Sequence, residues 1–160
     1  MLALRYAAVL ALVFWIGGLV ALGALAAPAV FDVLGPQPQG RALAGSVFGE
    51  TLRRFHLGTY ASGAVLITSL AARRVLGPRP RPFAFRMGLA VVITSATVWS
   101  GMVLSPRIES LRREAGVAPS TLPEADPRRV EFGRAHGLST SIQFVPLLGG
   151  LILLFFELKD

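Results

Sequence analysis

Residues 6–27 read YAAVLALVFWIGGLVALGALAA, an unbroken run without a charged side chain. A helix rises about 1.5 Å per residue, so about 20 apolar residues cross the hydrocarbon core of a bilayer, which is about 30 Å thick. A helix also pairs its own backbone N–H and C=O groups, which lipid cannot do. The run is longer than the apolar part of a secretory signal peptide. It therefore predicts a helix that spans a membrane.

The same pattern returns three times along the chain. The predicted spans are residues 6–28, 55–72, 87–105 and 135–156. Because successive spans must cross the membrane in alternate directions, neighbouring spans are expected to run antiparallel. The sequence thus predicts an all-α fold, an antiparallel up-and-down four-helix transmembrane bundle that forms one integral membrane domain over residues 1–160.

Composition narrows the functional classes. Only 16% of the residues are charged, against about a quarter in a typical soluble domain. The chain has no cysteine, which excludes disulfides, thiolate nucleophiles and cysteine-bound metal centres. The net charge of +7 comes from arginines that stand where the hydrophobic runs end, so we expect lipid headgroups and no nucleic acid as partners. No pattern predicts a catalytic residue, and we do not expect an enzyme.

The connection between the second and third spans suggests an orientation. It carries five arginines and no acidic residue: Arg73, Arg74, Arg79, Arg81 and Arg86. Loops rich in lysine and arginine stay on the cytoplasmic side of a membrane. We therefore predict a multi-pass protein of the cytoplasmic (inner) membrane with both termini in the cytoplasm.

On the opposite, outer face, two helices are predicted to continue beyond the lipid. Residues 41–55 place apolar side chains on one side and charged ones elsewhere, which indicates an amphipathic helix. This helix either lies in the membrane interface or extends the second span outward. Asp126 followed by Pro127 is typical of a helix start, so the fourth helix is expected to begin before its span.

The two histidines are the most informative polar residues. His56 and His136 stand at the starts of the second and fourth spans, which run in the same direction, so both lie at the outer face. Ser139 and Gln143 follow His136 on one helical face. Polar groups within a lipid span normally face the bundle interior. We predict a binding or transport-type membrane protein with a ligand or divalent-metal site formed by His56, His136, Gln143, Ser139 and Glu50.

Other interpretations of the same residues remain open. Two imidazoles on separate helices are typical axial ligands of haem b, and Arg54 and Arg134 would then contact its propionates. This alternative is an electron-transfer protein. A third interpretation is an accessory or scaffold subunit of a larger membrane complex, in which the histidines only pack or cap helices.

Tryptophan and glycine recur together on the two odd-numbered spans. The pairs are Trp15 with Gly17 and Trp99 with Gly101. Glycine allows helix backbones to approach closely in a membrane, so we assign these four residues to helix packing. The same small-residue faces suggest a homo-oligomer.

Short motifs carry a family resemblance across the whole chain. They are Phe14-Trp15-x-Gly17, Pro28-Ala-Val-Phe31, Ala44-Gly45-x-x-Phe48 and His136-Gly137-x-Ser139. With them the chain resembles the transmembrane protein 205-like family, a four-helix membrane domain of largely unknown function that is similar in appearance to copper-resistance D-type domains. The resemblance implies transport or export of metals. Members usually carry asparagine where this chain has Gln143, and the lack of cysteine and scarcity of methionine argue against a copper pathway.

Overall fold

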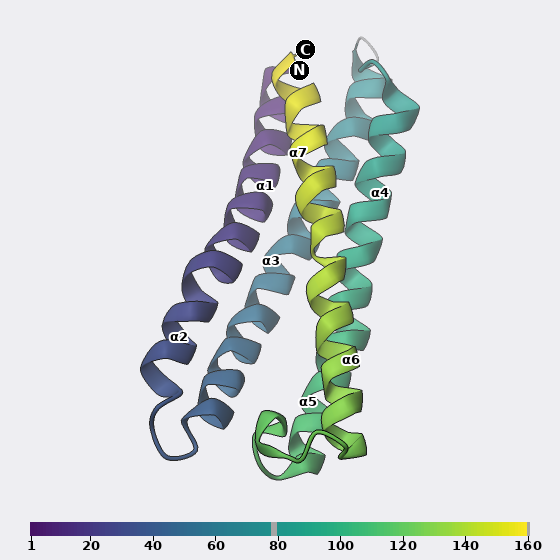
Figure 1. Cartoon of the computed structure of the whole chain (residues 1–160). Coiled ribbons are helices and arrows are strands. Elements are labelled where there is room, and N and C mark those ends of the chain that lie inside the picture. The colour runs from purple at the N-terminus through teal and green to yellow at the C-terminus, as the bar shows by residue number, and fades with distance from the viewer. Residues whose placement is uncertain (78–79, 160) are drawn as a thin grey trace.

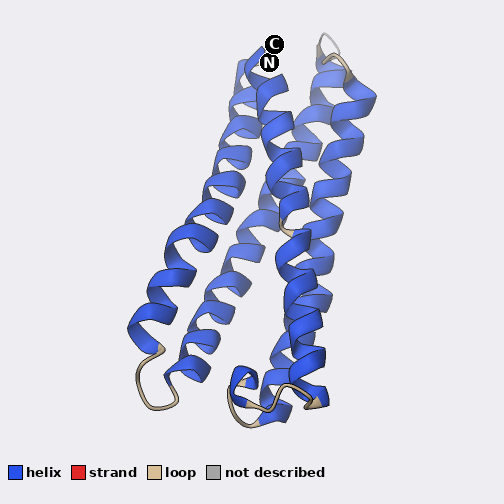
Figure 2. Ribbon diagram, in the orientation of Figure 1, coloured by secondary structure: helices blue, strands red, loops and turns tan. Residues whose placement is uncertain are grey.

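A computed structural model describes residues 1–77 and 80–159 and contains helices and no strand in that part of the chain (Figure 2). Four helices are long and apolar enough to cross a membrane, judged by length and composition: Leu2–Leu34, Gly40–Leu76, Phe83–Ala115 and Pro127–Lys159. The prediction of an all-α four-helix membrane bundle is confirmed. The shorter helices have 33 residues, so each is about 50 Å long and exceeds the roughly 30 Å of hydrocarbon.

Three of the four long helices contain an irregular turn. In chain order the elements are α1 (Leu2–Val20), the π-helical segment η1 (Ala21–Ala26), α2 (Ala27–Leu34), α3 (Gly40–Leu76), α4 (Phe83–Trp99), the π-helical segment η2 (Ser100–Leu104), α5 (Ser105–Ala115), the 3₁₀ turn η3 (Pro119–Thr121), α6 (Pro127–Ile142) and α7 (Phe144–Lys159). The helices run alternately up and down, and both termini lie at the same end of the bundle (Figure 1). Around the bundle, α1 contacts α3, α3 contacts α4, α4 contacts α7, and α7 contacts α1.

Proline explains where the irregular turns occur. Pro28 and Pro106 follow η1 and η2 closely, and Pro146 follows the turn at Gln143 that separates α6 from α7. Proline has no N–H to donate within a helix, and a wider turn just before it absorbs the missing bond. The second helix has no internal proline and is continuous over 37 residues.

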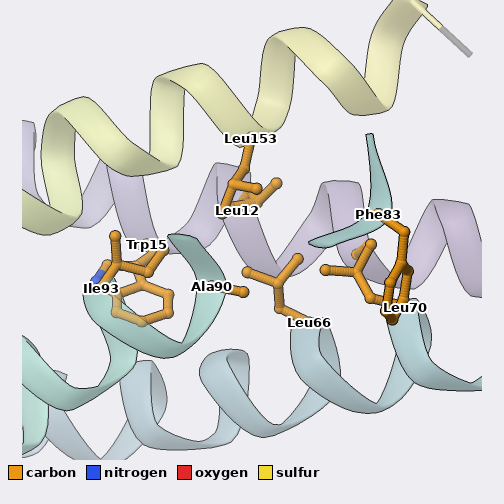
Figure 3. Packing of buried hydrophobic residues seen from close by; sticks show 9 residues of the cluster. Leu12, Trp15, Leu66, Leu70, Phe83, Ala90, Ile93 and Leu153 are labelled. Carbon is orange, nitrogen blue, oxygen red and sulfur yellow. The ribbon is translucent and has the colours of Figure 1, made fainter. Parts of the chain in front are cut away.

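The apolar core lies in the half of the bundle that holds the termini. Its members come from all four long helices and are Ala8, Leu12, Trp15, Leu66, Leu70, Phe83, Ala90, Ile93 and Leu153 (Figure 3). Glycine lets the fourth helix approach its neighbours here: a Cβ on Gly150 would lie 3.0 Å from Ile16 Cγ1. Close packing, more than exclusion of water, holds helices together in lipid. This end of the bundle is therefore its stable part.

The structure changes several sequence-based boundaries. The first helix was expected to end at Pro28 but continues to Leu34, because η1 accommodates the proline. Residues 41–55 form part of α3, so they extend the second span outward and do not form a separate helix. Arg73 and Arg86, assigned to a connecting loop, are both helical and buried. Arg79 lies outside the described residues.

Candidate functional site

A polar layer lies between the helices near the middle of the bundle, with His56 at its centre. His56 belongs to α3 and is 3% exposed. Its ring is stacked on that of Tyr60, one turn further along, with centroids 6.1 Å apart and planes at 3°. A Cβ placed on Gly101 would lie 2.8 Å from His56 Nδ1 and would also collide with the Tyr60 hydroxyl. Both side chains therefore lie directly against the backbone of η2.

The side of α3 that faces the third helix alternates small and polar residues. Gly63 lies against Thr94 of α4, and Gly45 and Gly49 lie under the guanidinium of Arg112 of α5. These glycines share a helical face with His56, since successive members of the series Gly45, Gly49, His56 and Gly63 are four or seven residues apart. Without side chains at these positions, α3 approaches the third helix, with extensive contacts along α4 and few along α5. We call this contact between α3 and the third helix the seam, and His56 lies in it because the two helices are close there.

Within residues 1–77 and 80–159, the buried polar nitrogens without a hydrogen-bond partner include one histidine and one tryptophan nitrogen in the bundle interior. They are Nε2 of His56 and Nε1 of Trp15, and Trp15 is 1% exposed. Leaving a buried donor or acceptor unpaired costs about 1–3 kcal/mol, and most buried polar atoms in proteins are paired. A neutral imidazole offers one donor and one acceptor, whereas an indole offers only a donor. The His56 nitrogen is thus available to a ligand or a water molecule.

The other polar groups of this layer have partners nearby. The Gln143 side chain donates to the Ser100 hydroxyl at 3.3 Å and so joins the turn between α6 and α7 to η2. The Thr59 hydroxyl donates to the His56 carbonyl at 2.9 Å. Because serine and threonine can bond their own helix, they are readily satisfied inside a membrane bundle. The Nε2 atom of the buried imidazole, in contrast, has no hydrogen-bond partner among the described residues.

His136 lies elsewhere. It is exposed, and its ring is stacked on Phe132 of its own helix with centroids 5.8 Å apart. Among the described residues no hydrogen bond or ring contact joins it to His56. Of the residues that follow it, Ser139 is buried and Gln143 is half-buried and directed to η2. The structure therefore brings Gln143, but not His136, to the helix that His56 faces.

The remaining predicted residues are dispersed. Glu50 forms ion pairs with Arg53 and Arg54, both at 2.7 Å. Arg134 is exposed, as is Trp99. Trp15 is buried in the core, where Figure 3 shows its ring beside Ile93. Gly17 has open space where a Cβ would be, so it does not pack within this chain, whereas Gly101 does.

The described residues hold no group of three or more His, Cys, Asp or Glu side chains that could bind a metal ion. A metal at His56 would therefore need water or a bound molecule for its other ligands. A haem between two histidines would need His136 to turn inward from its exposed position on α6. The polar side chains nearest to His56 in this layer, Tyr60 and the Ser100–Gln143 pair, carry hydroxyl and amide groups and no carboxylate.

A second buried polar cluster, which the sequence analysis missed, lies near the chain termini. Glu157 of α7 is 1% exposed. One of its oxygens accepts a hydrogen bond from Arg73 at 2.6 Å, and the other accepts one from Arg86. Arg5 of α1 donates to the Glu157 carbonyl at 2.7 Å. This ion cluster joins all four long helices.

The sequence did contain a signal for this cluster. In an antiparallel bundle, the end of the second helix, the start of the third and the end of the fourth lie at one face. Arg73, Arg86 and Glu157 occupy these three positions. A lone acid beside two arginines at one level predicts pairing, since an unpaired charge in lipid is costly. Arg73 and Arg86 had indicated only the orientation of the chain, because their pairing with Glu157 depends on how the helices pack.

Comparison with known proteins yields one match. A family model described as "Domain of unknown function (DUF4149)" matches residues 10–116, which comprise most of the first helix and all of the second and third. His56, Tyr60 and Gly101 lie within the matched residues. No curated protein and no solved structure matches the chain with significance. The comparisons do not show the expected similarity to the transmembrane protein 205-like family or to copper-resistance D-type domains.

Proposed function

The chain belongs to the DUF4149 family of unknown function, and we propose that it is a polytopic membrane protein that binds a small polar molecule inside its bundle, in a binding or transport role. The observation that carries this proposal is the buried His56 Nε2, which has no partner. Burying a polar atom without a partner is costly, so such an atom calls for an explanation, such as a functional role or a bound water molecule or ion. The ligand would accept from or donate to this imidazole.

The backbone near His56 supports the same proposal. The imidazole faces η2, and π-helical turns in α-helices occur frequently at functional sites. Gln143 interrupts the fourth helix and bonds to Ser100 of the same turn. Broken helices inside a membrane are tolerated where the freed polar groups are buried in protein or line a water-filled cavity. Two interrupted helices therefore meet beside the unpaired histidine.

Metal transport, which the resemblance to the transmembrane protein 205-like family implies, is a narrower version of this proposal. It would place His56 as one ligand of a divalent ion whose other ligands come from the transported species or water. The scaffold role and the haem-binding role remain alternatives. The three proposals predict different species bound to the purified protein: a small molecule, haem or another protein. One experiment can therefore distinguish them.

The test compares the purified protein with its His56→Phe and His136→Phe variants. Native mass spectrometry, metal analysis and visible absorbance measure what each protein carries. We expect a bound small molecule in the wild type and in His136→Phe, and its loss from His56→Phe. An identical set of bound species in all three proteins would refute the site. A Soret band that either substitution weakens would favour haem, and stoichiometric co-purification of another protein would favour a scaffold.

A further inference from the structure

The two ends of the bundle are held together very differently. At the end with the termini, the apolar core and the ion cluster of Arg5, Arg73, Arg86 and Glu157 join all four long helices. At the outer end, η1 and α2 contain no buried residue, α6 contains only Ser139, and α5 buries Leu111 and Ala115. Stability in a protein is distributed unevenly, and segments with few buried contacts open most readily. The outer end is therefore the one that can move.

At the outer end, α5 and α6 form a hairpin that holds together as a unit. The two helices pack on each other, and an ion pair joins Arg107 of α5 to Glu131 of α6. Arg129 of α6 donates to the Leu122 carbonyl at 2.6 Å and so fastens the connecting segment. In Figure 1 this hairpin lies beside the outer half of α3. These bonds are all internal to the hairpin.

The hairpin meets α3 through a polar contact. The Arg112 guanidinium lies over Gly45 and Gly49, so that a Cβ on Gly45 would be 3.3 Å from Arg112 Cζ. Glu109 accepts from Arg112 at 2.9 Å and positions it. A guanidinium resting on glycines can separate from them with little exposure of apolar surface, because glycine has no side chain to expose. This contact is suited to opening and closing.

Both connections of the hairpin to the stable end pass through an irregular turn. On one side α5 continues into η2, and on the other α6 ends at Gln143. The Gln143–Ser100 hydrogen bond places these two turns at the same level. Helix irregularities made by proline concentrate bending. The continuous α3 has none and serves as the fixed partner.

We infer that the α5–α6 hairpin is a lid, hinged at η2 and Gln143, which opens away from α3 at the Arg112 contact and admits ligand to His56 from the outer end. His56 lies on the α3 face that carries Gly45 and Gly49, so the opened seam leads to it. This inference rests on the proposed function only in that the molecule admitted is taken to be the ligand of His56. The motion itself can be measured without any ligand.

The natural lack of cysteine makes single-thiol reporters practical. Ser100→Cys places a thiol on η2, at a side chain that is fully buried, and Ser69→Cys places one at a similarly buried site in the stable half. We expect a polar maleimide to modify Ser100→Cys at least tenfold faster than Ser69→Cys. Thr97→Cys, also buried, repeats the measurement while leaving the Gln143–Ser100 bond intact.

Two arginine variants then test the closing contact. Adding Arg112→Ala to Ser100→Cys or to Thr97→Cys should raise the rate of modification several-fold, because the contact between α5 and α3 loses its guanidinium. Adding Arg113→Ala, an exposed neighbour on the same helix, should leave the rate unchanged. Equal protection of all reporters, or equal effects of the two arginine variants, would overturn the lid. Neither result bears on ligand loss in His56→Phe, so the two proposals fail independently.

Distances between spin labels give a second measurement. Labels at Leu43 of α3 and Val130 of α6, both exposed, span the lid seam. Labels at Val65 of α3 and Phe155 of α7 span the same two long helices in the stable half and are also exposed. We expect a broad or two-peaked distance distribution for the outer pair and one narrow peak for the inner pair. If the outer pair gave a single peak as narrow as that of the inner pair, the result would contradict a hinged hairpin.

Discussion

Gly101 leaves space that two aromatic side chains use. His56 and Tyr60 both lie where its Cβ would be, so Gly101→Ala must displace them or push η2 outward. Overpacking of this kind typically costs about 1–3 kcal/mol. We expect a lower free energy of unfolding in detergent, measured by denaturant titration. Gly88→Ala on the same long helix meets open space and should be neutral or slightly stabilising. Equal effects of the two substitutions would contradict the packing described.

Glu157 neutralises charge that the bundle buries. In Glu157→Gln, Arg73 and Arg86 would face an amide in place of a carboxylate. Removing one member of a buried ion pair typically costs about 3–5 kcal/mol. We expect a loss of that order in thermal or denaturant unfolding.

Glu50 supplies the control for the ion cluster, since it also pairs with two arginines but at an exposed site. Exposed ion pairs contribute little because water and salt screen them. Glu50→Gln should therefore leave stability almost unchanged. Similar losses in the two variants would mean that burial does not strengthen the Glu157 cluster.

At the scale of elements, the start of α6 depends on one carboxylate. Asp126 caps this helix by accepting from the Arg128 N–H at 2.9 Å, and it also pairs with the Arg128 side chain. The Arg128 side chain, followed by its backbone N–H, holds the pKa of Asp126 below its ordinary value of 3.8. The folded state thus favours the carboxylate. This contribution to stability is present above pH 3.8 and is lost as the pH falls through the lowered pKa.

An NMR titration in micelles tests this pH dependence. We expect Asp126 to titrate below 3.8, and the first turn of α6 to loosen as it is protonated. Asp126→Asn keeps an acceptor for the Arg128 N–H but cannot ionise, so its helix start should not change over this pH range. An ordinary or raised pKa for Asp126 would show that the cap does not stabilise the charged form.

At the scale of the whole molecule, the up-and-down arrangement places both termini at one face. Single cysteines at Gln37 and Val117, in the turn after α2 and the connection after α5, should react with an impermeant reagent from one side of the membrane. Cysteines at Leu2 and Lys159 should react only from the other side. We expect the latter side to be the cytoplasm, because of the arginines between the second and third spans. Reaction of Leu2 and Lys159 from opposite sides would exclude an even number of spans.

Sequence was sufficient for the number and kind of the long helices. A charge-free run near 20 residues has one stable form in lipid, and that form does not depend on its neighbours. The same local logic located the start of the fourth helix at Pro127, where the structure has it. It failed at Pro28, because whether proline ends a helix or follows a wide turn depends on the packing beyond it.

The candidate site was only partly visible in the sequence. His56 could be singled out because histidine is rare in a membrane span, but its partner could not be chosen. Sequence placed both histidines at the same face, whereas rotation about each helix axis decides which side chain points inward. That rotation turned His136 outward, directed Gln143 to η2 and left His56 Nε2 unpaired.

What the sequence determined by itself was the membrane-spanning helices and their alternating directions, since hydrophobic length and the lack of backbone partners in lipid are local constraints. What only the tertiary structure decided was which polar groups meet. Glu157 joins Arg73 and Arg86, and Gly101 receives His56 and Tyr60, although long stretches of chain separate these residues. Such contacts depend on the azimuth and register of packed helices, and no run of residues encodes these alone.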